Sequence, residues 1–244
     1  MPIKLRRWLW RWLPILFGCH CRPDRSFHFR DGTPFPICAR CTGELAGNLG
    51  IEAQVVSVCE PYEAFERVLA RACGGELAGL AAENTQARCR MVCLMALSNA
   101  YGWMLVNTGN KSEAMMGYST LYGDTAGAFA PLGGLYKTDV YAVARWRNAQ
   151  AEAAGAVPPV PERVFAKPPS AELSPNQEDE KSMGIDYPTL DALLQAHVER
   201  GLGADALVAE GFDAAQVERV LSTVRATAFK RALEPPYPQA PFYA

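Results

Sequence analysis

The residues of this chain that are best suited to chemistry lie in one short polar segment, residues 107–113 (NTGNKSE). The apolar run before it, residues 103–106, predicts a buried strand. In open α/β sheets ligands bind at the carboxyl ends of strands, so the Thr108 hydroxyl and nearby backbone amides can hold a phosphate or a purine edge. The Glu113 carboxylate can hold Mg²⁺. An ordinary polar loop in which Ser112 caps the next helix explains the same residues equally well.

Further motifs follow this segment in an order typical of one protein family. Residues 117–118 (GY) and 121–124 (LYGD) come next. Together the three segments resemble the second half of NAD synthetases, in particular the synthetase domain of the glutamine-dependent kind. The resemblance starts near residue 49 and ends near residue 236, and four more blocks support it: ENTQAR at 83–88, LMALSN at 94–99, KPPSAEL at 167–173 and FKR at 229–231. Such blocks in the right order make a specific signal, whereas any one alone is weak.

The resemblance implies an α/β fold like that of the ATP pyrophosphatases (adenine nucleotide α-hydrolase-like), a parallel sheet with flanking helices. In that fold a Ser-Gly-Gly-x-Asp-Ser loop after the first strand grips the pyrophosphate of ATP, and its Asp helps to hold Mg²⁺. The sequence contains no such loop, because its two Gly-Gly pairs, at 74–75 and 133–134, lack the flanking Ser and Asp. We therefore expect a truncated form of the fold, produced by gene fusion, truncation or a misassembled reading frame.

The resemblance also assigns roles to individual residues. Three match family positions that contact ATP: Thr108, Lys167 and Ser170. Three match positions that contact deamido-NAD (nicotinic acid adenine dinucleotide): Arg88, Asp124 and Lys230. Glu113 matches the Mg²⁺ ligand, and no side chain is expected to act as a catalytic acid or base. From the residues alone, plainer interpretations also hold, such as a surface charge for Arg88 and an exposed loop residue for Lys167.

The activity implied is that of a carbon–nitrogen ligase. ATP activates the carboxylate of deamido-NAD, ammonia replaces AMP, and NAD, AMP and pyrophosphate are the products. The sequence shows no nitrilase-like glutaminase domain, so ammonia is expected to come free or from a glutaminase partner. Loss of the pyrophosphate loop predicts impaired or absent turnover, since each lost electrostatic donor typically costs about 10²–10³ in rate. The family further implies a homodimer.

Residues 19–47 carry a separate group of possible metal ligands: Cys19, His20, Cys38 and Cys41. A Cys-x-x-Cys pair with an upstream Cys-His suits tetrahedral Zn²⁺, although free or redox-active thiols fit the spacing equally well. This piece resembles a family of small uncharacterised bacterial membrane proteins with Cys-His, Arg-Ser-Phe and Cys-Ala-Arg-Cys-Thr-Gly motifs. An alternative function follows, a non-catalytic fusion or remnant with a zinc-binding or membrane-associated N-terminal module.

Residues 1–18 form a basic, Trp-rich stretch that is too short to span a bilayer. It is typical of an interfacial anchor with peripheral membrane contact, of a remnant of a membrane protein, or of a plain helix packed on the domain. The predicted organisation is thus a basic helix at 1–18, a Cys/His-rich piece at 19–47 and a partial NAD-synthetase-like domain at 48–244.

The composition narrows the class of protein. The chain has 244 residues and a net charge of −2, which gives no reason to expect a nucleic-acid partner. Its eight cysteines do not form a secreted disulfide pattern, so a cytoplasmic location is expected.

Hydrophobic spacing and turn residues predict further elements: a strand at 54–58 and helices at 61–72, 84–99, 137–148, 187–198 and 213–233. Helix capping explains the Thr-Asp pair at 138–139.

Overall fold

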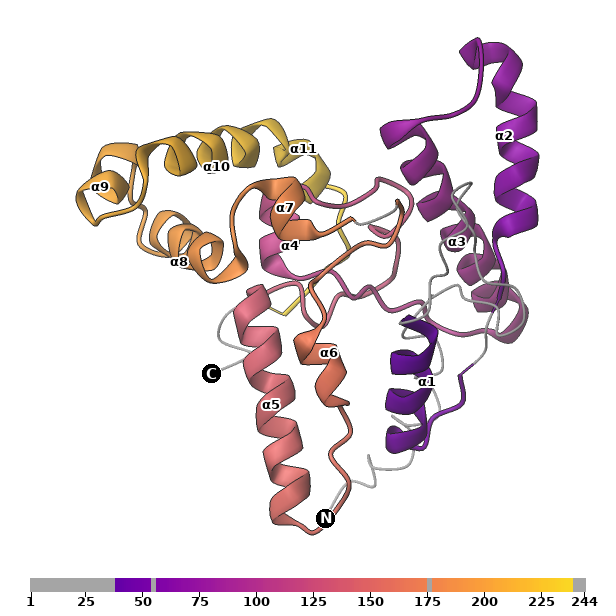
Figure 1. The fold of residues 1–244 in the computed structure, drawn as a ribbon, viewed down its shortest axis with the longest axis horizontal. Coiled ribbons are helices and arrows are strands. Elements are labelled where there is room, and N and C mark those ends of the chain that lie inside the picture. Colours follow the sequence, from indigo (N-terminus) through magenta and orange to yellow (C-terminus); the bar gives the residue numbers. More distant parts are fainter. Residues whose placement is uncertain (1–37, 54–55, 175–176, 239–244) are drawn as a thin grey trace. The chain divides into compact units, whose positions relative to one another are not determined.

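The computed structural model describes residues 38–53, 56–174 and 177–238. These residues are largely helical (Figure 1). The helices are α1 (Cys38–Leu49), α2 (Cys59–Cys73), α3 (Gly79–Tyr101), α4 (Lys111–Met116), α5 (Lys137–Ala153), α6 (Glu162–Ala166), α7 (Asp179–Met183), α8 (Tyr187–Val198), α9 (Ala204–Ala209), α10 (Ala214–Ala226) and α11 (Ala228–Arg231). No helix of this part of the chain is both long and apolar enough to cross a membrane.

The predicted strands are wrong for the residues that the structure describes. Within them the β-bridge residues are Val106 and Phe129, where the amide of Asn107 donates to the Phe129 carbonyl at 2.9 Å. The backbone of Trp103 is instead bonded to Ser98, at the end of α3. A strand needs a neighbouring strand for its amides and carbonyls, and an apolar run does not reveal whether one exists. In the second predicted strand residues 56–58 are irregular, and 54–55 lie outside the described residues.

The helices predicted after residue 48 are confirmed, whereas the basic helix predicted at 1–18 lies outside the described residues. The expected helices at 61–72, 84–99 and 137–148 lie within α2, α3 and α5, and the one at 187–198 coincides with α8. The helix expected at 213–233 is divided into α10 and α11 at Thr227. The Thr227 hydroxyl donates to the Thr223 carbonyl at 2.8 Å and contacts the Met115 carbonyl at 3.3 Å. This local hydrogen bonding competes with the regular helical pattern and ends α10.

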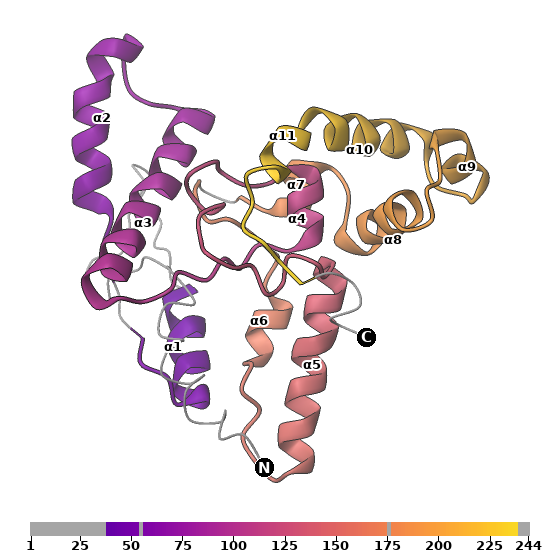
Figure 2. The ribbon, with the colours of Figure 1, turned by 180° about the vertical axis from the view of Figure 1, so that it is seen from behind.

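The chain divides into two compact units. Unit 1 contains the described residues up to Val106 together with Arg145–Lys167. In it α2 packs on α3 (Figure 2), and the end of α5 is tied to the segment before α6. The Asn148 side-chain amide donates to the Val160 carbonyl at 2.7 Å and its oxygen accepts from the Val160 amide at 2.9 Å. Arg145 lies 4.3 Å from the centre of the Phe165 ring.

Unit 2 contains Asn107–Ala144 and Pro168–Ala244, and the main apolar core belongs to it. Helix α9 contacts both α8 and α10, and α4 contacts α8, α10 and α11 (Figure 1). Apolar residues three and four positions apart place one face of α8 and one of α10 in this core. Its fully buried side chains include Leu190, Leu193, Leu194 and Leu207. The core fixes α4, which carries the polar segment singled out in the sequence.

Candidate active site

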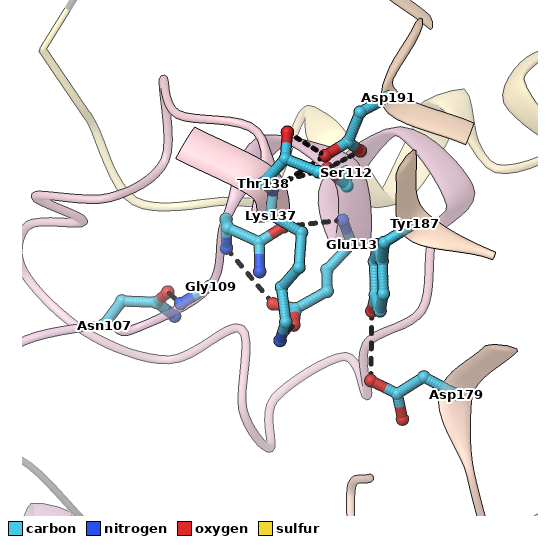
Figure 3. Close-up of polar contacts among 10 residues, drawn as sticks. Asn107, Gly109, Ser112, Glu113, Lys137, Thr138, Asp179, Tyr187 and Asp191 are labelled. Atoms are coloured by element: carbon cyan, nitrogen blue, oxygen red, sulfur yellow. Dashed lines mark hydrogen bonds and ion pairs between the residues drawn. The ribbon is translucent and has the colours of Figure 1, made fainter. Parts of the chain in front are cut away.

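The loop before α4 is shaped by a buried side chain, that of Asn107. Its oxygen accepts from the Gly109 amide at 2.7 Å (Figure 3). Its NH₂ group donates to the carbonyls of Asp124 and Ala126 at 2.6 and 3.0 Å. Gly127 passes close to this residue with φ +142°, and a Cβ there would lie 3.0 Å from the Asn107 amide nitrogen. One amide side chain thus holds the polar loop against the segment that carries Asp124.

Helix α4 begins with a capping box. The side chain of Asn110 accepts from the Glu113 amide at 3.0 Å, and Glu113 Oε2 accepts from the Asn110 amide at 3.2 Å. Reciprocal bonds of this kind satisfy two amides that a helix start otherwise leaves unpaired. The sequence analysis named Ser112 as the possible cap, and that assignment is wrong because Asn110 occupies the cap position.

The second oxygen of Glu113 accepts from Lys137. Lys137 Nζ lies 2.9 Å from Glu113 Oε1, and the two side chains are 17% and 21% exposed. Burial lowers the pKa of Lys137, but the charge and hydrogen bond of Glu113 outweigh it, and the net shift is upward. Lys137 also lies 5.2 Å from the centre of the Tyr187 ring, whose hydroxyl donates to Asp179 at 3.0 Å (Figure 3). The Glu113 carboxylate is therefore oriented at both oxygens.

A buried carboxylate joins α4, α5 and α8. Asp191, which is 1% exposed, accepts from Ser112 Oγ at 2.5 Å and from both the amide and the hydroxyl of Thr138 at 2.8 Å. Ser112 Oγ in turn accepts from the Lys137 amide at 2.9 Å. Burial raises the pKa of Asp191, and these hydrogen bonds oppose part of the rise. The network sets Glu113, which follows Ser112 in α4, and Lys137, which precedes Thr138 in α5, in a fixed relation.

The lysine of the polar segment faces a different group. Lys111 forms an ion pair with Glu199 at the end of α8 and lies 4.9 Å from the centre of the Tyr136 ring. The Tyr136 hydroxyl donates to the same carboxylate at 2.9 Å. Lys111 therefore fastens the start of α4 to the end of α8.

Two residues predicted to contact the dinucleotide lie close to each other in unit 2. Lys230 Nζ donates to the carbonyls of Gly117 and Ser119, at 2.7 and 2.6 Å, at the end of α4. Its charge acts on Asp124, whose Oδ1 accepts from the Thr120 amide at 2.5 Å. Asp124 keeps an exposed surface, yet desolvation by the surrounding protein raises its pKa, and the charge of Glu113 adds to the rise. Glu113, Asp124 and Lys230 thus form one electrostatic group.

The other predicted site residues are distributed over both units. Thr108 is exposed in the loop before α4, and Ser170 accepts from the Glu172 amide at 3.1 Å; both belong to unit 2. Arg88, which is exposed on α3, and Lys167, which follows α6, belong to unit 1.

The predicted zinc ligands cannot be placed. Cys19 and His20 lie outside the described residues, and so do the side chains of Cys38 and Cys41, although their backbone begins α1. In the part of the chain that is described, no group of three or more His, Cys, Asp or Glu side chains is arranged to hold a metal ion. The zinc site stays a prediction.

Sequence reasoning missed two charged residues: Lys137, which pairs with Glu113, and Asp191, which accepts from Ser112. Lys137 follows a Gly-Gly-Leu-Tyr turn and begins α5, where its neighbours suggested only a helix cap. Its ammonium group reaches a residue 24 positions earlier in the chain. The one local signal available was the Asn-x-x-Glu spacing at 110–113, which is typical of a capping box and shows that Glu113 has a fixed orientation.

The carboxylate oxygens near the start of α4 are suited to binding a divalent cation. Each Glu113 oxygen accepts one hydrogen bond, and a carboxylate oxygen has capacity for a second interaction. Mg²⁺ is usually held by one or two carboxylates together with phosphate oxygens and water. Asp179, within electrostatic range of Glu113, is 3% exposed, and its Oδ1 has no hydrogen bond of standard geometry among the described residues, although the Tyr118 hydroxyl faces it. The region thus has carboxylate oxygens with capacity left for a cation.

Comparison with known proteins points to one family. The family profile for NAD synthase matches residues 39–234. The chain is 41% identical over 187 residues to a glutamine-dependent NAD(+) synthetase of Thermotoga maritima, a match that covers 77% of this chain and 32% of that protein. It is 35% identical over 189 residues to an NH(3)-dependent NAD(+) synthetase of Chlorobaculum tepidum, covering 78% and 62%. The chain therefore spans about a third of the glutamine-dependent relative and less than two thirds of the NH(3)-dependent one.

A solved structure gives the same result for the fold. The NMN synthetase of Francisella tularensis superposes with a TM-score of 0.61 at 29% identity, over 79% of this chain and 69% of that one. The likeness supports the ATP-pyrophosphatase-like α/β fold class, even though the described residues here consist of helices and irregular segments with almost no strand.

Proposed function

This chain belongs to the NAD synthase family, and from that premise we propose that it acts in the ATP-dependent amidation of deamido-NAD to NAD. The observation that carries the proposal is the Glu113 carboxylate at the start of α4, held at one oxygen by the Asn110 amide and at the other by Lys137. A carboxylate oriented in this way and still partly exposed is suited to a metal that travels with nucleotide phosphates.

The proposed reaction has two steps. A carboxylate oxygen of deamido-NAD attacks the α-phosphorus of ATP, and the bond from that phosphorus to pyrophosphate breaks. Ammonia then attacks the activated carbonyl carbon, the bond to AMP breaks, and the nitrogen loses a proton to water. Neither step needs a strong acid or base from the protein, so the side chains serve mainly to orient the reactants and to balance phosphate charge.

Under this proposal Glu113 holds Mg²⁺, which when bound supplies charge neutralisation on the phosphate oxygens. Three residues contact ATP: Thr108, Lys167 and Ser170. Thr108 is exposed, which supports its proposed contact with ATP because a ligand can reach this residue. Ser170 lies one residue after Pro169, whose carbonyl accepts from the Asp179 amide at 2.9 Å, so its loop is fastened to α7.

The dinucleotide contacts proposed are Arg88, Asp124 and Lys230. The electrostatic coupling of Asp124 to Lys230 supports treating these two as one recognition element. The carbonyls of Gly117 and Ser119 that hold Lys230 fix where its charge lies. Arg88 is exposed on α3, as a ligand-contacting arginine has to be.

We also propose that the chain by itself turns over slowly. The sequence contains no Ser-Gly-Gly-x-Asp-Ser segment, so the charge-assisted contacts that such a loop gives to pyrophosphate have to come from elsewhere. Ammonia is proposed as the nitrogen donor, either free or delivered by a glutaminase partner. A cytoplasmic location and a homodimer complete the proposal, and light scattering of the purified protein tests the latter.

A second substrate is favoured by one observation. The Francisella tularensis neighbour is an NMN synthetase, which suggests the amidation of nicotinic acid mononucleotide. The dinucleotide remains the first proposal, because the named relatives of higher identity are NAD synthetases. The two substrates differ by an adenylate group, so recognition of the adenylate decides between them.

The experiment that tests the function supplies the purified chain with ATP, Mg²⁺ and ammonium chloride, together with either deamido-NAD or nicotinic acid mononucleotide. AMP, pyrophosphate and the amide product are measured, and exchange of labelled pyrophosphate into ATP follows the first step alone. We expect slow NAD formation from the dinucleotide and a loss of about a hundredfold in Glu113→Gln, since metal charge stabilisation is worth several kcal/mol.

Two other outcomes would favour a different function. Faster amidation of the mononucleotide would replace the first substrate with the second. No exchange and no product with either substrate, together with stoichiometric zinc that is lost in a Cys38→Ser/Cys41→Ser variant, would favour the non-catalytic module instead.

A further inference from the structure

The end of α4 is held by side chains of α11, and one of them, Arg231, has no role in the proposed mechanism. Its guanidinium group contacts two helices: Nη1 donates to the Met115 carbonyl of α4 at 3.1 Å, and Nη2 donates to the Val224 carbonyl of α10 at 2.8 Å. Nη1 also lies 3.4 Å from Thr227 Oγ1, at the junction of α10 and α11. The last four carbonyls of a helix lack an amide partner within that helix, so one cation here satisfies the ends of two helices.

The contact between α4 and the junction of α10 and α11 is closely packed. Gly117, the C-cap of α4, has φ +59°, and a Cβ at this position would overlap the side chain of Thr227. The Thr227 hydroxyl itself contacts the Met115 carbonyl at 3.3 Å. Glycine allows this close approach because it has no Cβ, and α11 lies beside α4 as a result (Figure 1).

Both dinucleotide contacts proposed in unit 2 are attached to this contact region. Lys230 precedes Arg231 in α11, and its ammonium group donates to the carbonyls of Gly117 and Ser119, which follow α4. Asp124 belongs to the segment that continues from there, residues 117–124, and the charge of Lys230 acts on it. The side chain of Arg231 therefore ties the helix that carries one contact to the segment that carries the other.

We propose that Arg231 is a positioning residue for recognition of the dinucleotide, because it fixes the position of Lys230 relative to Asp124. The inference rests on the proposed function, since it takes these two residues as contacts of deamido-NAD. Thr108 and Ser170, the ATP contacts proposed in the same unit, lie before α4 and before α7. Loss of the Arg231 side chain therefore weakens binding of deamido-NAD and leaves binding of ATP unchanged.

The test measures the dissociation constants of deamido-NAD and of MgATP, each alone, for the full chain by isothermal titration calorimetry. Arg231→Met should bind deamido-NAD at least about tenfold more weakly, because it loses charge-assisted hydrogen bonds, and should bind MgATP within about twofold of the wild type. Arg231→Lys keeps the charge but replaces two separate donor nitrogens with one, so it should recover only part of the affinity. Arg225→Met is the matched control, since Arg225 is an exposed arginine of α10 that lies 3.8 Å from Glu218, and its loss should change neither constant.

A second measurement follows the protein without any ligand. Amide hydrogen exchange at residues 117–124 should be faster in Arg231→Met and unchanged in Arg225→Met. Gly117→Ala disturbs the same contact from the other side, because the added Cβ has to displace Thr227, and it should also weaken deamido-NAD binding alone. Near-UV circular dichroism and a thermal melt verify that each variant is folded, and Arg231→Gln is a second neutral variant with the same expected loss.

Several results would overturn the proposal. Unchanged deamido-NAD affinity in Arg231→Met contradicts it, and so does an equal loss of affinity for both ligands, which is the result expected of a residue that only stabilises the fold. Full recovery in Arg231→Lys would show that the charge alone matters. A wild-type chain that binds no deamido-NAD would contradict the proposed function, and the exchange rates at 117–124 would still decide whether Arg231 holds this segment.

Discussion

The two units bury their helices to very different extents. In unit 2, α8 and α10 each contribute an apolar face to the core, and Leu190, Leu193 and Leu194 are fully buried. In unit 1 no side chain of α2 is buried, and α3, although it has 23 residues, buries only Ala87 and Cys89. Because most helix stability in proteins comes from packing of an amphipathic face rather than from propensity, unit 2 has its own source of stability and α2–α3 has much less.

Side-chain hydrogen bonding differs between unit 2 and helices α2 and α3 of unit 1 in the same way as burial does. The candidate site of unit 2 is held by buried side chains such as Asn107 and Asp191, each with two or more hydrogen bonds. Helices α2 and α3 of unit 1 have no side-chain hydrogen bond at their N-caps, Val58 and Ala78. A site that has to orient a carboxylate needs rigid support, and unit 2 provides it through these buried side chains.

The largest effect expected from this comparison is on core packing. Leu194→Ala should lower the free energy of unfolding by about 3 kcal/mol, because truncating a fully buried leucine removes apolar contacts and leaves a cavity. The matched change in unit 1 is Leu80→Ala, since Leu80 is 73% exposed on α3, and it should change stability by less than about 0.5 kcal/mol. Urea denaturation followed by circular dichroism measures both. Similar losses in the two variants would show that the division between the units is wrong.

The buried network should give the next largest effect. Asp191→Ala leaves the Ser112 hydroxyl and the Thr138 amide and hydroxyl without their acceptor, and an unsatisfied buried donor costs about 1–3 kcal/mol. We therefore expect a loss of stability together with faster amide hydrogen exchange at the starts of α4 and α5. Asp205→Ala removes an exposed carboxylate from α9 of the same unit and should leave exchange at α4 unchanged. Unchanged exchange in Asp191→Ala would contradict the positioning role of the network.

The sequence predicted the helices well, whereas the site residues stay a prediction. Apolar spacing located α2 and α8 because that signal is local. The strand at residues 103–106 failed because strand formation depends on a partner that the run itself does not encode. Glu113 was identified by its motif, but Lys137 is 24 residues away along the chain. Only the folded structure, through the turn before α5 and the Asp191 network, brings the two together.

Helix capping offers a test with a smaller expected effect, in which one variant should lose stability and the other should gain it. Asn110→Ala removes the side-chain acceptor of the capping box at α4 and should cost about 1 kcal/mol. The opposite change in unit 1 is Ala78→Ser, at the uncapped N-terminus of α3, where the backbone has φ −139° and ψ 160°, an extended conformation suited to a capping residue. This variant should gain stability of a similar size. Differential scanning calorimetry measures both, and a destabilising Ala78→Ser would contradict the account of α3.

The smallest effect expected is a pH dependence that separates two carboxylates of unit 2. Burial raises the pKa of Asp179, and the Tyr187 hydrogen bond and the Lys137 charge offset only part of the rise. At Asp186, the N-cap of α8, hydrogen bonding from the Thr189 amide lowers the pKa. The unfolded chain titrates near a pKa of about 3.9 at both positions.

The two shifts have opposite consequences for stability. The folded state binds the Asp179 proton more tightly than the unfolded chain does, so stability from this group is present below about pH 4 and is lost as the pH rises through the folded pKa. Asp179→Asn cannot ionise, and its stability relative to the wild type should rise between about pH 4 and pH 7. Asp186 contributes stability that is present above the unfolded pKa and is lost as the pH falls through the lowered folded pKa. Asp186→Asn should therefore fall relative to the wild type as the pH rises towards about 4, and should stay level above it. Urea denaturation at several pH values measures both slopes. Slopes of the same sign would show that Asp179 is not held in the buried environment that surrounds Lys137 and Tyr187.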